Sequence, residues 1–277
     1  MRKRRMWFVG ALGLVMAATV PGSAVASGTQ NVEAGFSPEK NASITFPAPA
    51  ANLSNKFSKA GTIRQHLFLT DIVGAPPALQ TVDIHAPEEL KFTSKGIDEC
   101  DPASIAGQTP DQARAICPDA QLGTGQASAL GIATPGPVTL FNGTKQNGNP
   151  TVLFHTFTAN VPIVLVSEMQ NSPLGSPYGT LFHTPVSTTV GGGVPPGIVI
   201  TDTDFTLSKK YKDKKLIKKA KKAKKKGNTK KAKKLRKKAK KSWVTAECTD
   251  GTYETRVDFI HASEPTQSPT ATQQCTS

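Results

Sequence analysis

Residues 151–168 read TVLFHTFTANVPIVLVSE, a stretch rich in β-branched and aromatic residues. Alternate residues from Val152 to Thr156 fall on one face of an extended chain, and the residues between them fall on the other. A period of two is typical of a half-buried β-strand. The stretch therefore predicts two strands, Thr151–Thr158 and Val161–Glu168.

Further short runs of strand-forming residues follow between residues 62 and 261, each bounded by glycine, proline or asparagine. With 21 prolines, 23 glycines and no long helix between the strands, the chain favours an all-β fold, an antiparallel β-sandwich with Pro/Gly-rich loops. In the body of the chain only Pro110–Ile116 (PDQARAI) is predicted to be a helix. The other expected strands are Thr62–Asp71, Leu79–His85, Leu90–Thr93, Val138–Phe141, Gly179–His183, Gly197–Leu207, Trp243–Cys248 and Tyr253–His261.

Composition also indicates how the chain is divided. Residues 27–60 are rich in Ala, Asn, Pro and Ser, and are predicted to be an irregular lead-in with one strand at Ser43–Phe46. Residues 61–208 plus 242–277 suit one large β-domain or two small sandwiches, and we favour a single β-sandwich domain. Residues 209–241 interrupt this domain with a lysine-rich insertion, expected to be flexible and partly helical.

The first 26 residues have the three parts of a secretory signal peptide. Arg2–Arg5 is a basic region, Met6–Val20 is apolar, and Ala24–Ala26 supplies a small-x-small cleavage site. A retained membrane anchor is the alternative, although fifteen apolar residues are fewer than the roughly 20 that cross a bilayer as a helix. We therefore expect a secreted, extracellular or envelope-associated protein with no transmembrane segment after cleavage of the signal.

Four cysteines follow the predicted signal: Cys100, Cys117, Cys248 and Cys275. An even, small number of cysteines in an exported chain indicates two disulfides, for which three pairings exist. Pairing in sequence order, Cys100 with Cys117 and Cys248 with Cys275, closes the shortest loops. A metal site is the alternative, but there is no C-x2-C pair and no histidine at ligand spacing from a cysteine.

Positive charge is concentrated in residues 209–241. This segment holds 21 of the chain's 34 Lys and Arg residues and one of its 20 acidic residues, Asp213, a balance of +20. The predicted signal holds four more basic residues, so the rest of the chain has nine basic and 19 acidic residues, a balance of −10. We therefore expect an acidic body that carries one cationic arm.

The insertion reads KKYKDKKLIKKAKKAKKKGNTKKAKKLRKKAKK, with KKAKK as an imperfect repeat. Apolar residues have helical spacing in both halves, and Gly227-Asn228-Thr229 between them indicates a helix stop and a cap. Like charges four residues apart cost about 0.2–0.5 kcal/mol per pair, so we expect a solvated, fluctuating arm that gains helix when an anion neutralises it. The apolar positions are Leu216, Ala220, Ala223, Ala232, Leu235 and Ala239.

A polymer that neutralises many lysines releases counterions, so such an arm should bind polyanions in a salt-dependent way. Within residues 209–241, Arg236 is the sole arginine and Tyr211 the sole aromatic residue, so the insertion should not recognise a particular nucleic-acid sequence. The expected partners are anionic cell-wall polymers, acidic lipid headgroups or extracellular nucleic acid; a solubilising loop without a ligand is the alternative. The residues expected to bind polyanions are Lys218, Lys219, Lys221, Lys222, Lys224, Lys225, Lys226, Lys230, Lys231, Lys233, Lys234, Arg236, Lys237, Lys238, Lys240 and Lys241.

A further indication comes from the run Ile116–Gly125 (ICPDAQLGTG), which Cys100 precedes. It resembles the segment C-P-x-x-S-x-[VI]-G-T-[GA] of uncharacterised exported β-rich proteins from high-GC Gram-positive (actinobacterial) bacteria, although Gln121 stands at the serine-like position. The similarity covers most of residues 80–261, but Cys248 is placed differently relative to Trp243. The resemblance implies export, disulfides and a β-rich fold, and no enzymatic activity is established for that family.

No linear motif indicates catalysis, a metal or a cofactor. Ser37–Lys40 matches the penicillin-recognising S-x-x-K pattern, but it contains Pro38 and has no K-T-G partner, so we attribute it to chance. Asp202 and Asp204 alternate on an expected strand and could form an acid pair or a calcium site, with an exposed polar strand end as the alternative. None of the histidines stands in a zinc-binding motif; they are His66, His85, His155, His183 and His261.

The sequence thus favours a secreted or envelope-associated, non-catalytic protein whose arm binds anionic polymers without specificity. A secreted hydrolase of unrecognised type and a structural envelope protein with no ligand are the two alternatives. No cofactor is expected, and the ligand and the oligomeric state are left open.

Overall fold

The computed structural model describes residues 27–39, 42–53, 59–74, 76, 79–158, 160–186, 199–249 and 251–276, so the predicted signal lies outside the described residues. Most of the described chain is β-structure, with helices in two places. The strands are β1 (Ser27–Ser37), β2 (Ala51–Asn52), β3 (Lys59–Ala60), β4 (Thr62–Val73), β5 (Leu79–Pro87), β6 (Leu90–Phe92), β7 (Gln121–Ala129), β8 (Gly136–Gln146), β9 (Asn149–Thr158), β10 (Val161–Asn171), β11 (Tyr178–Pro185), β12 (Ile200–Leu207), β13 (Lys210–Lys212), β14 (Lys240–Ser242), β15 (Val244–Ala246), β16 (Thr252–His261) and β17 (Thr270–Thr276). The helices are α1 (Pro102–Ile105), α2 (Pro110–Ile116), α3 (Lys214–Lys225) and α4 (Thr229–Ala239).

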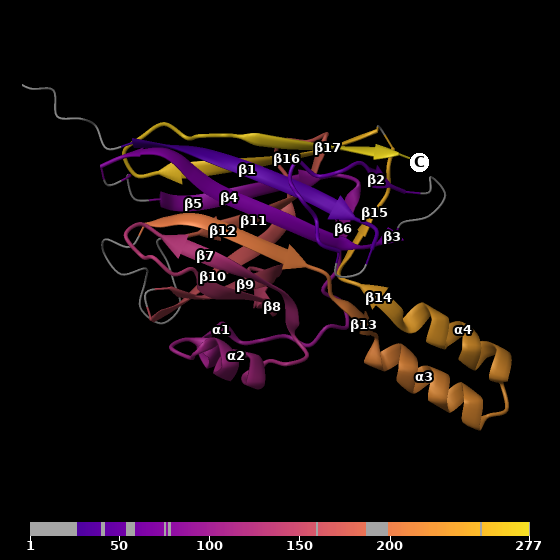
Figure 1. Cartoon of the computed structure of the whole chain (residues 1–277). Helices are drawn as coiled ribbons and strands as arrows, with labels where there is room; N and C mark the ends of the chain where they lie inside the picture. The colour runs from indigo at the N-terminus through magenta and orange to yellow at the C-terminus, as the bar shows by residue number, and fades with distance from the viewer. Residues whose placement is uncertain are drawn as a thin grey trace, which may run out of the picture.

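Within the described residues, twelve strands form one sheet in the order β1-β4-β12-β7-β8-β9-β10-β11-β5-β16-β17-β2, with a parallel pair only at β17 and β2. The sheet curls until it nearly closes into a barrel (Figure 1). The all-β prediction is confirmed. The predicted two-sheet sandwich is not, because hydrogen bonds run continuously through one sheet whose accumulated twist brings its ends together.

The seam of the curled sheet lies between β1 and the β16–β17 hairpin, and two glutamine side chains bridge it. The backbone N–H of Phe36 donates to Oε1 of Gln273 at 2.8 Å, and Nε2 of Gln273 donates to the carbonyl of Phe36 at 2.9 Å. Gln267 makes the equivalent bonds with the N–H of Gln30 at 2.8 Å and the carbonyl of Gly28 at 2.9 Å. These amides therefore satisfy backbone groups of β1 that a neighbouring strand would otherwise pair with.

The main core fills the inside of the curled sheet. Inward-facing residues such as Ile84, Phe182 and Phe205 pack around Trp243, whose side chain is fully buried. Trp243 stands between β14 and β15, directly before the small sheet β3-β15-β6, which lies near the end where the arm leaves the body (Figure 1). Each Å² of apolar surface buried contributes about 25 cal/mol, so this core is the main source of stability of the body.

A second apolar cluster lies outside the sheet, where α1 and α2 cover β8, β9 and β10. Ile105 and Ala113 of the helices pack with Phe141, Leu153 and Val164 of the strands. Both faces of β9 are therefore buried, which explains why its sequence is apolar on both. The predicted helix Pro110–Ile116 is confirmed as α2, whose capping box joins Thr109 and Gln112.

The two disulfides join Cys100 to Cys117 and Cys248 to Cys275, which is the sequential pairing. The first ties the start of α1 to the end of α2, and the second ties β17 to the segment after β15. Loops of this size contribute about 3 kcal/mol each in the chain-entropy account. Disulfides form and persist in oxidising compartments, so they indicate a location outside the reducing cytoplasm. No helix among the described residues is long and apolar enough to cross a membrane.

The prediction of an irregular lead-in at residues 27–60 is wrong for its first part, because Ser27–Ser37 forms the long strand β1. Only Val32 and Phe36 of this strand are buried apolar residues, so it lacks a strong local signal and is held by its pairing with β4. The strand expected at Ser43–Phe46 does not form. The strands β7 and β17 were also not predicted, because glycine or small polar residues dominate them, and neither were the short strands β2, β3, β13 and β14.

Candidate functional site: a cationic helical hairpin

The lysine-rich insertion leaves the body on a short two-stranded ribbon. β13 and β14 pair antiparallel, with Lys210 opposite Ser242 and Lys212 opposite Lys240. The hydroxyl of Tyr211 donates to the carbonyl of Lys95 at 2.7 Å and fixes the ribbon to the body. The boundaries predicted from charge, 209–241, therefore coincide with this neck.

Beyond the neck, α3 and α4 form a helical hairpin, which confirms the two predicted helices. Asp213 caps α3 by accepting from the N–H of Leu216 at 3.0 Å, and Asn228 caps α4 by accepting from the N–H of Lys231 at 3.0 Å. Gly227, with a φ of 71°, makes the left-handed turn between them. The predicted stop and cap are thus confirmed; whether the arm fluctuates in solution stays a prediction.

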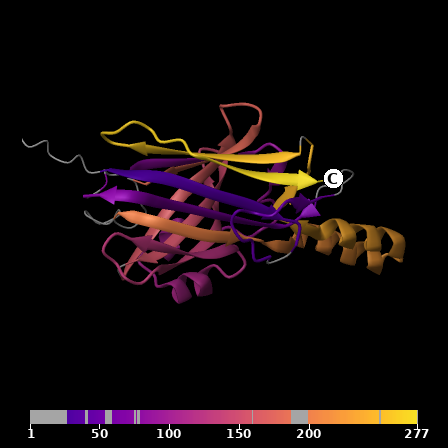
Figure 2. The same ribbon diagram turned by 45° about the horizontal axis from the view of Figure 1, so that its top comes forward.

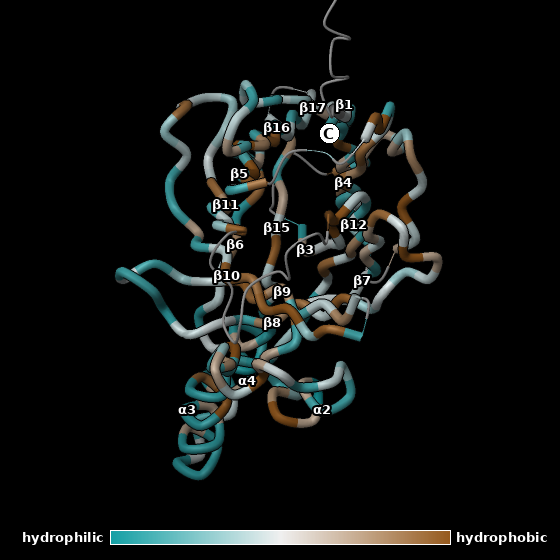
Figure 3. The backbone as a smooth tube through the Cα atoms, turned by 90° about the vertical axis from the view of Figure 1, so that its left-hand side faces the viewer, coloured by the Kyte–Doolittle hydropathy of each residue, from teal (hydrophilic) through white to brown (hydrophobic). Residues whose placement is uncertain are grey.

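Small residues let the two helices pack closely. Ala220 and Ala223 of α3 and Ala232 and Ala239 of α4 are all buried. The stripes predicted from helical spacing therefore face each other and not the body. In Figure 3 the hairpin is mostly hydrophilic around this narrow seam.

Charge covers the remaining surface of the hairpin. Every Lys and Arg from Lys210 to Lys241 is exposed, including all sixteen residues predicted to bind polyanions. Among the described residues, only Lys214 of this group is ion-paired, with Nζ 2.7 Å from Asp98 and 3.4 Å from Asp119. The hydrogen bond to Asp98 is the main cause that raises the pKa of Lys214. The arm is tied to the acidic body at its base alone.

Figures 1 and 2 show the hairpin extending away from the sheet in both views, so its outer surface faces solvent. At its base a cleft of about 500 Å³ is lined by Lys209, Lys210, Lys241 and the carboxylates of Asp98 and Asp119.

The predicted pair Asp202 and Asp204 does share the outer face of β12, but each is paired with a basic side chain. Nε2 of His66 lies 2.8 Å from Asp202, and Nδ1 of His66 lies 2.9 Å from Glu33. Nε of Arg64 donates to Asp204 at 2.9 Å. These pairs account for the two aspartates, and no group of three or more His, Cys, Asp or Glu in the described part of the chain is arranged to hold a metal.

A second polar row, not predicted from the sequence, surrounds His85. Nδ1 of His85 lies 2.9 Å from Oγ of Ser172, and Nε2 lies 3.4 Å from Oδ2 of Asp258. Nε of Arg256 donates to the same aspartate at 2.7 Å. The ring of Tyr178 lies beside that of His85, with centroids 5.8 Å apart. Burial is the main cause that raises the pKa of Tyr178 to about 12, and its hydrogen bond to Glu254 is the second. Glu254, Arg256 and Asp258 come from β16, whereas the other residues of the row come from β5, β11 and the loop after β10, so no linear motif could have revealed the row.

The other histidines lie apart from this row. Nε2 of the fully buried His155 bonds the carbonyl of Gln108 at 3.0 Å and so fixes the α1–α2 connection; burial lowers its pKa. His183 lies 2.7 Å from Asp83 on neighbouring strands, and His261 is buried. Of the S-x-x-K match, Ser37 ends β1, and Lys40 lies outside the described residues.

The fold and this site define a mostly β, disulfide-bonded body that presents a cationic helical hairpin. In comparisons with known proteins, no family model and no curated protein matched the chain. The resemblance of Ile116–Gly125 to actinobacterial exported proteins therefore stays a prediction. In the structure this run covers the end of α2 and the first half of β7.

Proposed function

We propose that this is an exported, non-catalytic protein that binds anionic polymers through the hairpin α3–α4. The observation that carries the proposal is the free charge of the hairpin. Lys214 alone is neutralised by carboxylates of the described body, and the other basic residues of the hairpin are exposed to solvent. A surface of this kind binds a polyanion by releasing its counterions.

The geometry also supports the expected lack of specificity. Tyr211, the one aromatic residue of the insertion, is half-buried and hydrogen-bonded to Lys95, so it offers no platform for stacking bases. Leu216, Ile217 and Leu235 are only half-exposed, which leaves little apolar surface to enter a bilayer. These features favour a soluble or wall-bound polyanion over a membrane surface.

The register of the neck provides a test. Because Lys212 lies opposite Lys240, an Asn-Gly turn can replace residues 213–239 and leave β13 paired with β14. We expect this variant to lose retention on immobilised heparin or on purified anionic wall polymer at low salt. Its melting temperature should match that of the intact chain, because the hairpin packs mainly on itself.

A charge-conserving control separates charge from shape. We expect Lys218, Lys219, Lys221 and Lys222 to tolerate substitution by arginine with retention unchanged, whereas glutamine at the same positions should lower the eluting salt concentration. Gln and Arg have similar helix propensities, so both variants keep the helix. Equal retention of the shortened and intact chains would refute the proposal. The hydrolase and the ligand-free envelope protein remain the alternatives.

A further inference from the structure

Two adjoining cavities lie inside the curled sheet, away from the cationic hairpin. One of about 40 Å³ is lined by Gln65 and Trp243 among apolar side chains. The other, of about 110 Å³, lies toward the end of the sheet where β12 begins, and it reaches Gln30 and Thr201. Ile84, Phe154 and Phe205 form walls of both cavities. Together they are comparable with a cavity of about 150 Å³ that binds benzene.

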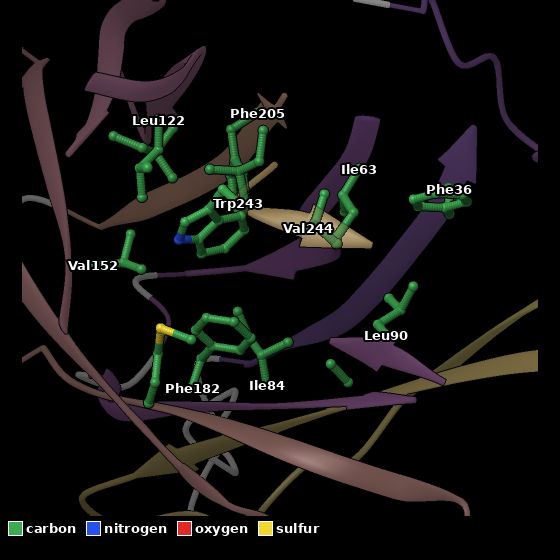
Figure 4. Packing of buried hydrophobic residues seen from close by; sticks show 14 of the residues in the cluster. Phe36, Ile63, Ile84, Leu90, Leu122, Val152, Phe182, Phe205, Trp243 and Val244 are labelled. Carbon is green, nitrogen blue, oxygen red and sulfur yellow. The ribbon is translucent and has the colours of Figure 1, made fainter. Parts of the chain in front are cut away.

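Two polar groups in the smaller cavity have no partner. Nε2 of Gln65 and Nε1 of Trp243 are buried, and neither has a hydrogen-bond partner among the described residues. Gln65 is 6% exposed and Trp243 is 0% exposed. In Figure 4 the indole nitrogen of Trp243 points into the space between Leu122 and Val152. A buried donor without a partner costs about 1–3 kcal/mol, so two in one cavity call for an acceptor.

The chemistry of the cavity restricts what that acceptor can be. A carbonyl oxygen has two lone pairs and brings no donor, so it can satisfy both N–H groups. A water would bring two donors of its own, and Thr255 is the one hydroxyl among the residues that line the smaller cavity. Among the described residues that line the two cavities there is no Lys or Arg, so a carboxylate would be buried there without a countercharge.

We propose that the interior of the sheet binds a small, neutral, apolar molecule with one carbonyl oxygen, such as a ketone or aldehyde of about six to nine heavy atoms. The oxygen accepts from Gln65 and Trp243, and the apolar part of the molecule occupies the larger cavity. This site is separate from the hairpin, so either proposal can fail without the other.

The test uses the disulfide-bonded chain and two probes of nearly the same shape. Acetophenone has the carbonyl oxygen, and α-methylstyrene has a CH2 group in its place. Trp7 lies in the predicted signal peptide, so in a chain that starts at Ser27 the indole N–H resonance belongs to Trp243. We expect acetophenone to shift this resonance downfield in a saturable way, and α-methylstyrene to bind about five- to tenfold more weakly.

Gln65→Leu removes the amide and keeps the volume. We expect it to weaken acetophenone binding about fivefold and to leave α-methylstyrene binding unchanged, whereas Gln126→Leu on the exposed face of β7 should change neither. Without ligand, Gln65→Leu should melt at the same or a higher temperature, because it removes an unsatisfied buried group. No saturable shift with acetophenone, equal binding of the two probes, or a lower melting temperature of Gln65→Leu would each overturn the proposal.

Discussion

His66 lies between two carboxylates on the outer face of the sheet, and its ring stacks on Phe68 with centroids 4.5 Å apart. Burial alone lowers the pKa of His66, but hydrogen bonds with Asp202 and Glu33 outweigh it and raise the pKa above its ordinary value. A histidine whose folded pKa is raised contributes stability that is complete below the unfolded pKa of about 6.5. That contribution is lost as the pH rises from there through the raised pKa of the folded state.

At the residue scale we therefore predict a pH-dependent effect of His66→Gln. The free energy of unfolding should favour the wild type by up to about 1 kcal/mol at pH 5.5, a typical value for partly exposed ion pairs. The difference should shrink as the pH rises to 8.5. Urea unfolding of both proteins across this range measures it, and a gap that widens with pH would contradict the assignment.

Individual residues also show which contacts can be predicted from neighbours in the sequence and which cannot. The capping box at Thr109 and the cap at Asn228 both depend on neighbours three residues away, and the cap at Asn228 was predicted from the sequence. Asp202 and His66 are 136 positions apart, and their contact depends on the register of β12 against β4. The sequence therefore showed two alternating acids but not the histidine that pairs with one of them.

At the element scale, β7 shows why a strand inside a sheet can contain several glycines. Gly123, Thr124 and Gly125 lie within this strand, between β8 and β12. A Cβ on Gly123 would overlap the carbonyl oxygen of Thr206, and one on Gly125 would overlap that of Asp204. Glycine is needed there for the close approach of β12.

Gly123→Ala should therefore destabilise the protein by about 1–3 kcal/mol, because β12 must move away to admit the methyl group. Thr124→Ala, on the exposed neighbouring position, is the control and should change the free energy of unfolding by less than about 0.5 kcal/mol. Chemical unfolding measures both. Equal stability of the two variants would show that β12 relaxes without cost.

At the scale of the whole molecule, the seam decides whether the sheet stays curled. Gln273 is 4% exposed and satisfies both backbone groups of Phe36. We predict that Gln273→Ala lowers the free energy of unfolding by at least about 2 kcal/mol, because it leaves a buried N–H and a buried C=O unpaired.

The adjacent Gln274 is exposed and provides a matched control. Gln274→Ala should be within about 0.5 kcal/mol of the wild type. Hydrogen exchange locates the effect: the amide of Phe36 should exchange faster in the Gln273 variant and unchanged in the Gln274 variant. Unchanged protection of Phe36 in both variants would mean that β1 is held by β4 alone.

The sequence by itself determined the strands of period two, the helix α2, the two helices of the insertion, and the four cysteines as disulfide partners. These depend on residue type and on neighbours within a few positions. Only the tertiary structure decided that one sheet curls nearly closed, that Gln267 and Gln273 bridge its seam, and that Gln65 and Trp243 meet at one cavity. Strand order and register bring such residues together, and a one-residue change of register would turn each side chain to the opposite face.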